Sequence, residues 1–225
     1  MSIAEGQRYH RGAHLRATGA VVAVLASLVA DRAAYADAKE ASLHAHVIGG
    51  VARLGEDDAA TPATVALVGV GARFTYAFSH HLAWEAAMAV ETATAASYAD
   101  HPNPAGTGFR GTLSRTTRLA RLELGATARL GVRYIPTIHL GVGVATRFRG
   151  AASFRFQGTT DDDAFPAELA LDLVAVAGVG FDYRISRRWI AGVSAEGRHA
   201  VPLGGPSFDS VEGFVHVAAY WYPRW

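Results

Sequence analysis

Cysteine is absent from the 225 residues, which excludes disulfide bridges, thiolate metal sites and thiol redox chemistry. Lysine is nearly absent as well, because Lys39 is the only one and arginine makes up the rest of the 21 lysine and arginine residues. There is therefore no polybasic lysine tract to bind phosphates. Half of the residues are apolar, yet no apolar run reaches the roughly 20 residues that a membrane-spanning helix needs. The apolar residues require a different structural explanation.

The longest uncharged apolar run extends from Ala17 to Ala30, close to the N-terminus. Three arginines precede it, and Ala34-Tyr35-Ala36 follows it with small residues where a signal peptidase requires them. A buried N-terminal helix is the alternative, but the run lacks polar positions at helical spacing. We therefore predict that residues 1–36 are a secretory signal peptide and that residues 37–225 form the mature domain.

Charge gives little indication of a partner. Removing residues 1–36 would leave 17 of the 21 basic and 18 of the 20 acidic residues, a net charge near −1. A nearly neutral domain does not favour a nucleic-acid partner, since such partners are held by excess positive charge. We expect no cofactor.

From Ala41 onward the sequence alternates with period two, which is typical of strands whose two faces meet different surroundings. In residues 116–131, alanine and leucine occupy one set of alternate positions, and charged or small residues occupy most of the other. Each alternating segment exceeds the roughly 9–11 residues that a tilted strand needs to cross a bilayer. Eight such segments are predicted, at about 42–55, 64–78, 82–94, 116–131, 137–148, 167–183, 189–201 and 211–225.

The connections between these segments are of two kinds. Three short ones lie near Ser79–His81, Arg133–Pro136 and Ser186–Arg188, so the repeating unit is a pair of strands. Short turns at one end and long loops at the other are typical of transmembrane β-barrels. The longer connections are rich in Gly, Pro, Asp and Thr and cover about 56–63, 95–115, 149–166 and 202–210.

Alternation alone does not say which face is the interior, because a soluble barrel would bury its apolar side chains. The charged face carries both signs at matching heights, with Glu85 expected to pair with Arg129 and Glu91 with Arg121. Buried charges must be matched in this way, because an unpaired one costs several kcal/mol. Glycines share that face, as a narrow interior requires. The predicted interior polar network consists of Arg73, Glu85, Glu91, Arg121, Glu123, Arg129, Arg147, Asp172, Asp182, Glu196 and Arg198.

Aromatic residues gather near the short-turn ends of the strands and are scarce in the middle. An amphipathic ring suits the level of lipid headgroups, so the pattern predicts an aromatic girdle. The alternative is the general preference of aromatic residues for strands. The predicted girdle consists of Phe74, Tyr76, Trp84, Tyr134, Phe181, Tyr183, Trp189, Trp221 and Trp225.

The last predicted strand ends on an aromatic residue, and its outer face carries Val211, Val215, Val217, Trp221 and Trp225. Together with the signal peptide, the eight strands and the three short turns, this resembles the small outer-membrane barrels of the OmpA/OmpX type. The resemblance implies an all-β, eight-stranded antiparallel up-and-down transmembrane barrel in the cell outer membrane. It also implies contact with outer-membrane lipids, including lipopolysaccharide, and recognition of the last strand by the barrel-assembly machinery.

The interior network allows two interpretations: a conducting or proton-relay lumen, or a salt-bridge plug. The plug is favoured because an eight-stranded interior is just wide enough to be filled by side chains. His44, His46, His139 and His216 also face inward, but we expect no metal site, with His216 placed at mid-strand or above and His139 across the barrel.

Three surface features are candidates for binding. The acidic runs Glu56-Asp57-Asp58 and Asp161-Asp162-Asp163 can bind divalent cations or simply be solvated loop tips. Arg53 and Arg118 are expected on the lipid face near the outer rim, as candidates for contact with lipid phosphates, although such arginines also snorkel without a partner.

No His-x-Ser pair suggests a deacylase, and Ser79-His80 lies in a short turn away from surface lipid. We therefore predict a non-enzymatic outer-membrane barrel with a structural or surface-interaction role through its loops near 95–115 and 149–166. A narrow passive pore, a lipid A-modifying enzyme and a soluble ligand-binding barrel remain alternatives.

Overall fold

The computed structural model describes residues 39–157, 162–203 and 205–222. The predicted signal peptide and Trp225 lie outside these residues. Within the described ranges, no helix is long and apolar enough to cross a membrane.

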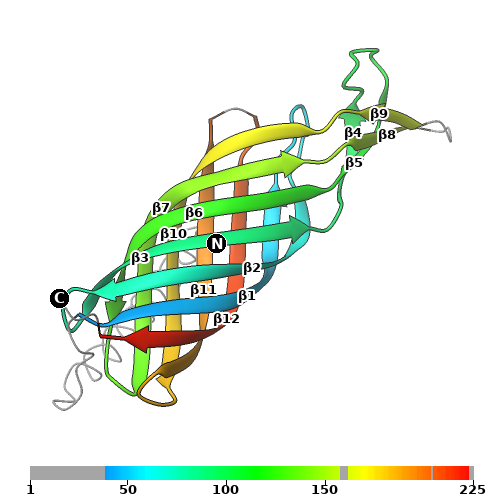
Figure 1. Cartoon of the computed structure of the whole chain (residues 1–225). Helices are drawn as coiled ribbons and strands as arrows, with labels where there is room; N and C mark the ends of the chain where they lie inside the picture. The colour runs from blue at the N-terminus through cyan, green and yellow to red at the C-terminus, as the bar shows by residue number, and fades with distance from the viewer. Residues whose placement is uncertain (1–38, 158–161, 204, 223–225) are drawn as a thin grey trace, which may run out of the picture.

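Eight long strands close into an antiparallel barrel in the order β1-β12-β11-β10-β7-β6-β3-β2 (Figure 1). Barrel strands that follow one another along the chain are neighbours in space, which confirms the predicted eight-stranded antiparallel up-and-down barrel. The strands are β1 (Ala41–Leu54), β2 (Ala63–Ala77), β3 (Leu82–Ala93), β6 (Thr117–Arg129), β7 (Tyr134–Arg149), β10 (Glu168–Arg184), β11 (Trp189–Pro202) and β12 (Phe208–Trp221).

The last strand differs most from its predicted range of 211–225. It pairs with β1 from Phe208 opposite Leu54 to Trp221 opposite Ala41. Since β1 begins at Ala41, it offers no strand residue opposite any position beyond Trp221. The strand therefore begins and ends earlier in the sequence than predicted, so each of its side chains lies nearer the short turns than the sequence suggested.

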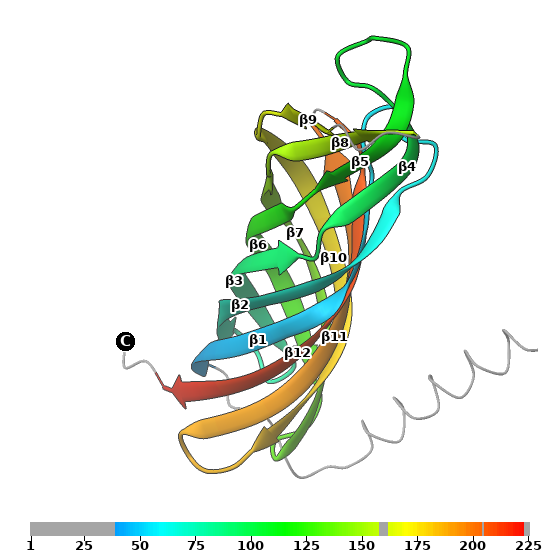
Figure 2. The ribbon, with the colours of Figure 1, turned by 90° about the vertical axis from the view of Figure 1, so that its right-hand side faces the viewer.

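The segments predicted as the two longest loops contain a second sheet, which corrects that expectation. Its strands are β4 (Ala96–Pro102), β5 (Arg110–Arg115), β8 (Ala152–Phe156) and β9 (Asp162–Phe165), in the order β4-β5-β8-β9. The barrel strands that precede or follow them, β3, β6, β7 and β10, are neighbours in the same order. One half of the barrel wall therefore continues beyond the barrel as a protruding sheet (Figure 2).

Apolar side chains cover the outside of the barrel. Val47 is 64% exposed, Val70 61% and Leu140 61%, whereas the alternate positions on the same strands are mostly buried. An apolar cluster also fills the interior near the protruding sheet, where Leu54, Leu67, Leu119 and Phe208 pack with Tyr98 and Phe154. The interior is thus polar over most of its length. At the long-loop end an apolar cluster lies beside a buried ion pair, since Arg147 is opposite Leu119 and Asp172 is opposite Ala145.

Candidate functional site

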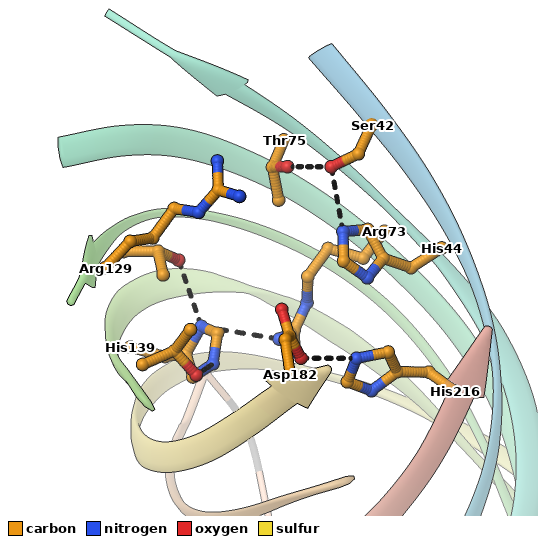
Figure 3. A pocket seen from close by; sticks show the side chains of 10 residues that line it. Ser42, His44, Arg73, Thr75, Arg129, His139, Asp182 and His216 are labelled. Atoms are coloured by element: carbon orange, nitrogen blue, oxygen red, sulfur yellow. Dashed lines mark hydrogen bonds and ion pairs between the residues drawn. The ribbon is translucent and has the colours of Figure 1, made fainter. Parts of the chain in front are cut away.

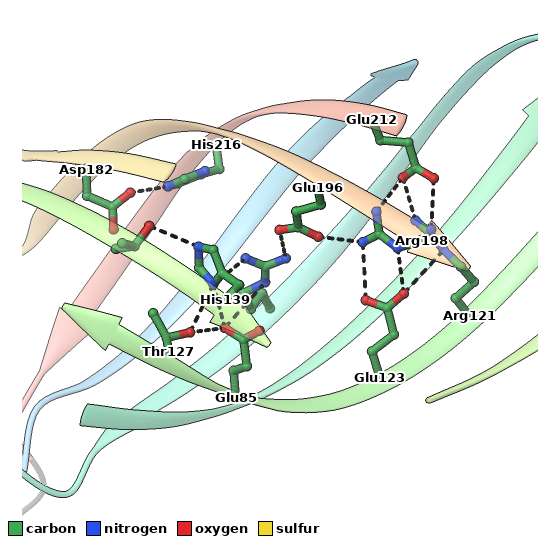
Figure 4. A network of polar contacts seen from close by, with 12 residues as sticks. Glu85, Arg121, Glu123, Thr127, His139, Asp182, Glu196, Arg198, Glu212 and His216 are labelled. Carbon is green, nitrogen blue, oxygen red and sulfur yellow. Dashed lines mark hydrogen bonds and ion pairs between the residues drawn. The ribbon is translucent and has the colours of Figure 1, made fainter. Parts of the chain in front are cut away.

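The middle of the barrel interior is filled by a network of arginine and glutamate side chains (Figure 4). Arg198 on β11 lies at its centre. Its guanidinium donates to Glu123 Oε1 at 2.8 Å, to Glu212 Oε2 at 2.9 Å and to Glu196 Oε2 at 2.6 Å. On the other side, Glu196 accepts a 2.5 Å bond from Arg73. These carboxylates are each bound by arginine, as buried charges require.

Arg121 continues the network toward the long-loop end. It pairs with Glu91 and donates two 3.0 Å bonds to Glu212. Of the two ion pairs expected from spacing, Glu91–Arg121 is therefore present.

The expected Glu85–Arg129 pair does not form. In the observed register Glu85 lies opposite Gly125, so Arg129 is four residues nearer the short turns. There Arg129 donates to Glu40 at 2.7 Å, while Glu85 lies 4.0 Å from Arg73 Nε and 3.1 Å from His139 Nδ1.

A small cavity lies on the short-turn side of the network, lined by Ser42, His44, Asp182 and His216 among others. Figure 3 shows the side chains that line it. Its volume of about 20 Å³ accommodates about one water molecule. His216 Nε2 donates to Asp182 Oδ1 at 2.8 Å, and His44 Nε2 lies 2.9 Å from Ser42 Oγ.

His216 is closer to the first-strand histidines than expected. Its ring centroid lies 5.1 Å from that of His44, and it pairs in register with His46, because β12 is shifted as described above. His139 binds the hydroxyls of Thr127 and Thr137 at 3.0 Å each. Among the described residues, no group of three or more His, Cys, Asp or Glu side chains is arranged to hold a metal ion.

A second ionic cluster lies at the long-loop end, where β5 ends at Arg115 and β7 ends at Arg149. Glu56 accepts a 2.6 Å bond from Arg149 and lies 3.6 Å from Arg115 Nε. Glu56 is only 8% exposed, so the first acidic run is not simply a solvated loop tip. Burial raises the pKa of the Glu56 carboxyl, against the opposing effect of the two arginines. Burial likewise raises the pKa of Tyr98, whose hydroxyl donates to the Leu54 carbonyl, to about 12.

The eleven residues of the predicted interior network all lie on the inner face and are each less than a tenth exposed. The sequence reasoning missed five further buried ions: Glu40, Glu56, Arg115, Arg149 and Glu212. Alternation along the last strand would have placed Glu212 inside. The other four lie just outside the predicted strands, where alternation gave no signal.

The predicted girdle residues within the described ranges lie on the outer face near the short turns, several in mutual contact. Phe74 lies 5.3 Å from Trp84 and 6.3 Å from Trp221, and Tyr134 lies 5.3 Å from Tyr183, measured between ring centroids. Arg53 and Arg118 are both exposed on the outer face near the long-loop ends of β1 and β6.

No family model and no curated protein matches this chain. Among solved structures, Ail, the attachment invasion locus protein of Yersinia pestis in complex with the heparin analogue sucrose octasulfate, superposes with a TM-score of 0.50 at 10% identity. The match covers 82% of this chain and 100% of Ail.

Two other solved structures align less well. OprG from Pseudomonas aeruginosa has a TM-score of 0.46 at 16% identity, over 83% of this chain and 97% of that chain. Neisserial surface protein A has a TM-score of 0.43 at 10% identity, over 81% and 97%. The likeness to Ail is one of fold: this chain has the fold of the small eight-stranded outer-membrane barrels.

Proposed function

We propose that the protein is an integral outer-membrane barrel that carries out a non-enzymatic surface-interaction role through its protruding sheet. The observation that carries the membrane location is the inverted distribution of side chains, with valine and leucine outside and ion pairs inside. Exposed apolar surface on this scale is unfavourable in water and favourable in lipid. A soluble barrel would have the opposite distribution. The partners proposed are outer-membrane lipids and, during insertion, the barrel-assembly machinery.

Two features support a closed interior. The charged network joins opposite walls of the barrel, since Arg121 on β6 reaches Glu212 on β12. At the long-loop end, the apolar cluster lies beside the ion pairs of Arg147 with Asp172 and of Arg149 with Glu56. Apolar packing of this kind is unfavourable for the passage of ions. We therefore propose a structural network in place of a pore.

The protruding sheet supports the interaction role. Its inner face is buried, with Leu113 and Phe154 at most 1% exposed. Its outer face presents short polar side chains, including Ser97 and Ser114, whose hydroxyl oxygens lie 3.0 Å apart, and exposed Thr112. An ordered, polar and solvent-facing surface is suited to contact with a macromolecule.

Fractionation of cells that produce the full chain tests the membrane location. We expect recovery in the outer membrane, extraction only by detergent, and an electrophoretic mobility that changes on heating. A freely soluble periplasmic product would contradict the proposal. Planar-bilayer recording of the purified protein tests the closed interior, and steady single-channel currents would contradict it.

A test of the interaction role requires a variant in which the protruding sheet is shortened and the barrel is kept. Replacing residues 97–114 by a two-residue Asn-Gly turn would join β3 and β6 directly. Cells displaying this variant should adhere less to heparin-coated or matrix-protein-coated surfaces than cells displaying the full chain. Ail suggests heparin as the first probe, since it was solved with a heparin analogue. Equal adhesion of folded, heat-modifiable forms would argue against the role.

A further inference from the structure

The outer face of the barrel carries very few ionisable side chains. Among its outward-facing strand residues, the arginine, histidine and carboxylate side chains are Arg53, Arg118, His199 and Asp209. Three of these four lie side by side. Asp209 on β12 is directly opposite His199 on β11 and directly opposite Arg53 on β1. We call this set, with Thr64 opposite Arg53 on β2, the rim row.

The rim row has the groups needed to bind a polar ligand. His199 Nδ1 donates to Asp209 Oδ1 at 2.6 Å, and the two side chains are 66% and 48% exposed. The second ring nitrogen of His199 and the other Asp209 oxygen form no further hydrogen bond within the described part of the chain. Arg53 is exposed and forms no ion pair with any described residue. The guanidinium-bearing Arg53 therefore lies on the strand next to a hydrogen-bonded pair, Asp209 and His199.

An apolar groove continues from the rim row around the outer wall. It has a volume of about 490 Å³ and is lined by Leu124, Val142, Ala175 and Val201, among others. Ala175 is the direct partner of His199, and Val142 is the direct partner of Ala175, so the groove begins where the rim row ends.

The rim row and the groove together run from the long-loop end of the barrel toward the middle of its apolar outer wall. Arg53 is the last residue but one of β1 and Asp209 is the second of β12, both next to the long-loop end. Ala175 lies seven residues from that end of β10, and Val142 seven residues from that end of β7. A ligand that occupies both the rim row and the groove has its polar part at the long-loop end and its apolar part against the middle of the outer wall.

We propose that the rim row and the groove bind one molecule of a phosphorylated glycolipid of the outer leaflet. Arg53 binds its phosphate, because guanidinium is well suited to phosphate oxygens. Asp209 and His199 bind its sugar hydroxyls, and the groove holds an acyl chain. An isolated rim arginine snorkels without a partner, but it does not account for the neighbouring histidine and carboxylate or for the groove. This inference rests on the proposed membrane location.

The chain supplies matched controls for both parts of the site. Arg118 is an outward arginine near the long-loop end of β6, without a histidine or carboxylate opposite, since its partners are Thr92 and Phe148. Ala177 is an outward alanine two residues from Ala175 on β10, and it does not line the groove.

Purified protein in detergent is titrated with diphosphorylated lipid A, with phosphatidylglycerol and with inorganic phosphate, and bound lipid is counted by native mass spectrometry. We expect a single lipid A molecule per chain and weaker binding of phosphatidylglycerol. Arg53→Gln and Ala175→Phe should each lower lipid A affinity by about tenfold or more, whereas Arg118→Gln and Ala177→Phe should leave it unchanged.

The outcomes separate the two proposals. A wild-type chain that is soluble and not heat-modifiable overturns the membrane location. A folded, heat-modifiable barrel with equal affinities for all four variants overturns the lipid site alone. Inorganic phosphate that competes fully with lipid A also overturns it, because the groove would then contribute nothing.

Discussion

Arg198 is the side chain on which the interior network depends most. It is 4% exposed and binds Glu123, Glu196 and Glu212. In an Arg198→Met variant, Glu196 keeps Arg73 and Glu212 keeps Arg121, but Glu123 keeps only a 3.8 Å contact with Arg121 Nε. Removing one partner of a buried ion pair costs about 3–5 kcal/mol, because the remaining charge is left in the interior. We expect a loss of this size in the free energy of unfolding.

The loss is measured by urea unfolding of the protein in lipid vesicles, followed by the fluorescence of tryptophans such as Trp84 and Trp189. The matched control is Arg110→Met, which removes a 2.7 Å ion pair with Asp100 whose side chains are 50% and 64% exposed. That change should cost no more than about 1 kcal/mol.

A second substitution tests the cause of the loss. Adding Glu123→Gln to Arg198→Met removes the charge left unpaired, so the double variant should be more stable than Arg198→Met alone. If the Arg198 and Arg110 variants lose equal stability, or if Glu123→Gln lowers stability further, the reasoning about buried charge is refuted.

Three further predictions concern other parts of the structure. Glu85→Ala and Arg129→Ala should lower the free energy of unfolding additively, because the two side chains bind different partners; a double-mutant cycle with a coupling above about 0.5 kcal/mol would contradict this. Gly178→Ala should destabilise the barrel by about 1–3 kcal/mol, because the new Cβ would lie 2.5 Å from Glu196 Cγ. Gly49→Ala on the outer face should leave stability unchanged, because no atom lies within 4 Å of its new Cβ, and the urea midpoints of the two variants test the difference. Folding raises the pKa of the Tyr98 phenol to about 12, so its contribution to stability should be fully present below about pH 10 and be lost as pH rises through about 12. The difference between the ultraviolet titrations of wild type and Tyr98→Phe measures the ionisation of this phenol. An ionisation near pH 10 would contradict the prediction.

The fold and the polarity of each face follow from a local property of the sequence. Alternation with period two identifies strands and divides their side chains into two sets, and it requires no knowledge of pairing. Residues 116–131 illustrate this, since their alternation alone placed Arg121 and Arg129 on one face, and both are buried in the interior. The sequence of short and long connections then predicted an up-and-down barrel.

Register, by contrast, was decided only by closure of the barrel. Each strand must pair with two neighbours at once, so the offset between strands depends on the whole ring. This is why the structure pairs Arg129 with Glu40 in place of Glu85, and why His216 lies beside His44. The same closure brings β11, β12 and β1 together.

The protruding sheet and the rim row also required the tertiary structure. The strands of the sheet are short, and their pairing with one another depends on the barrel strands that hold them side by side. Arg53, Asp209 and His199 are distant in sequence, and only cross-strand pairing makes them neighbours. The sequence by itself determined the strands and their two faces, and the tertiary structure determined which side chains meet, because contact across a barrel is set by register and not by alternation.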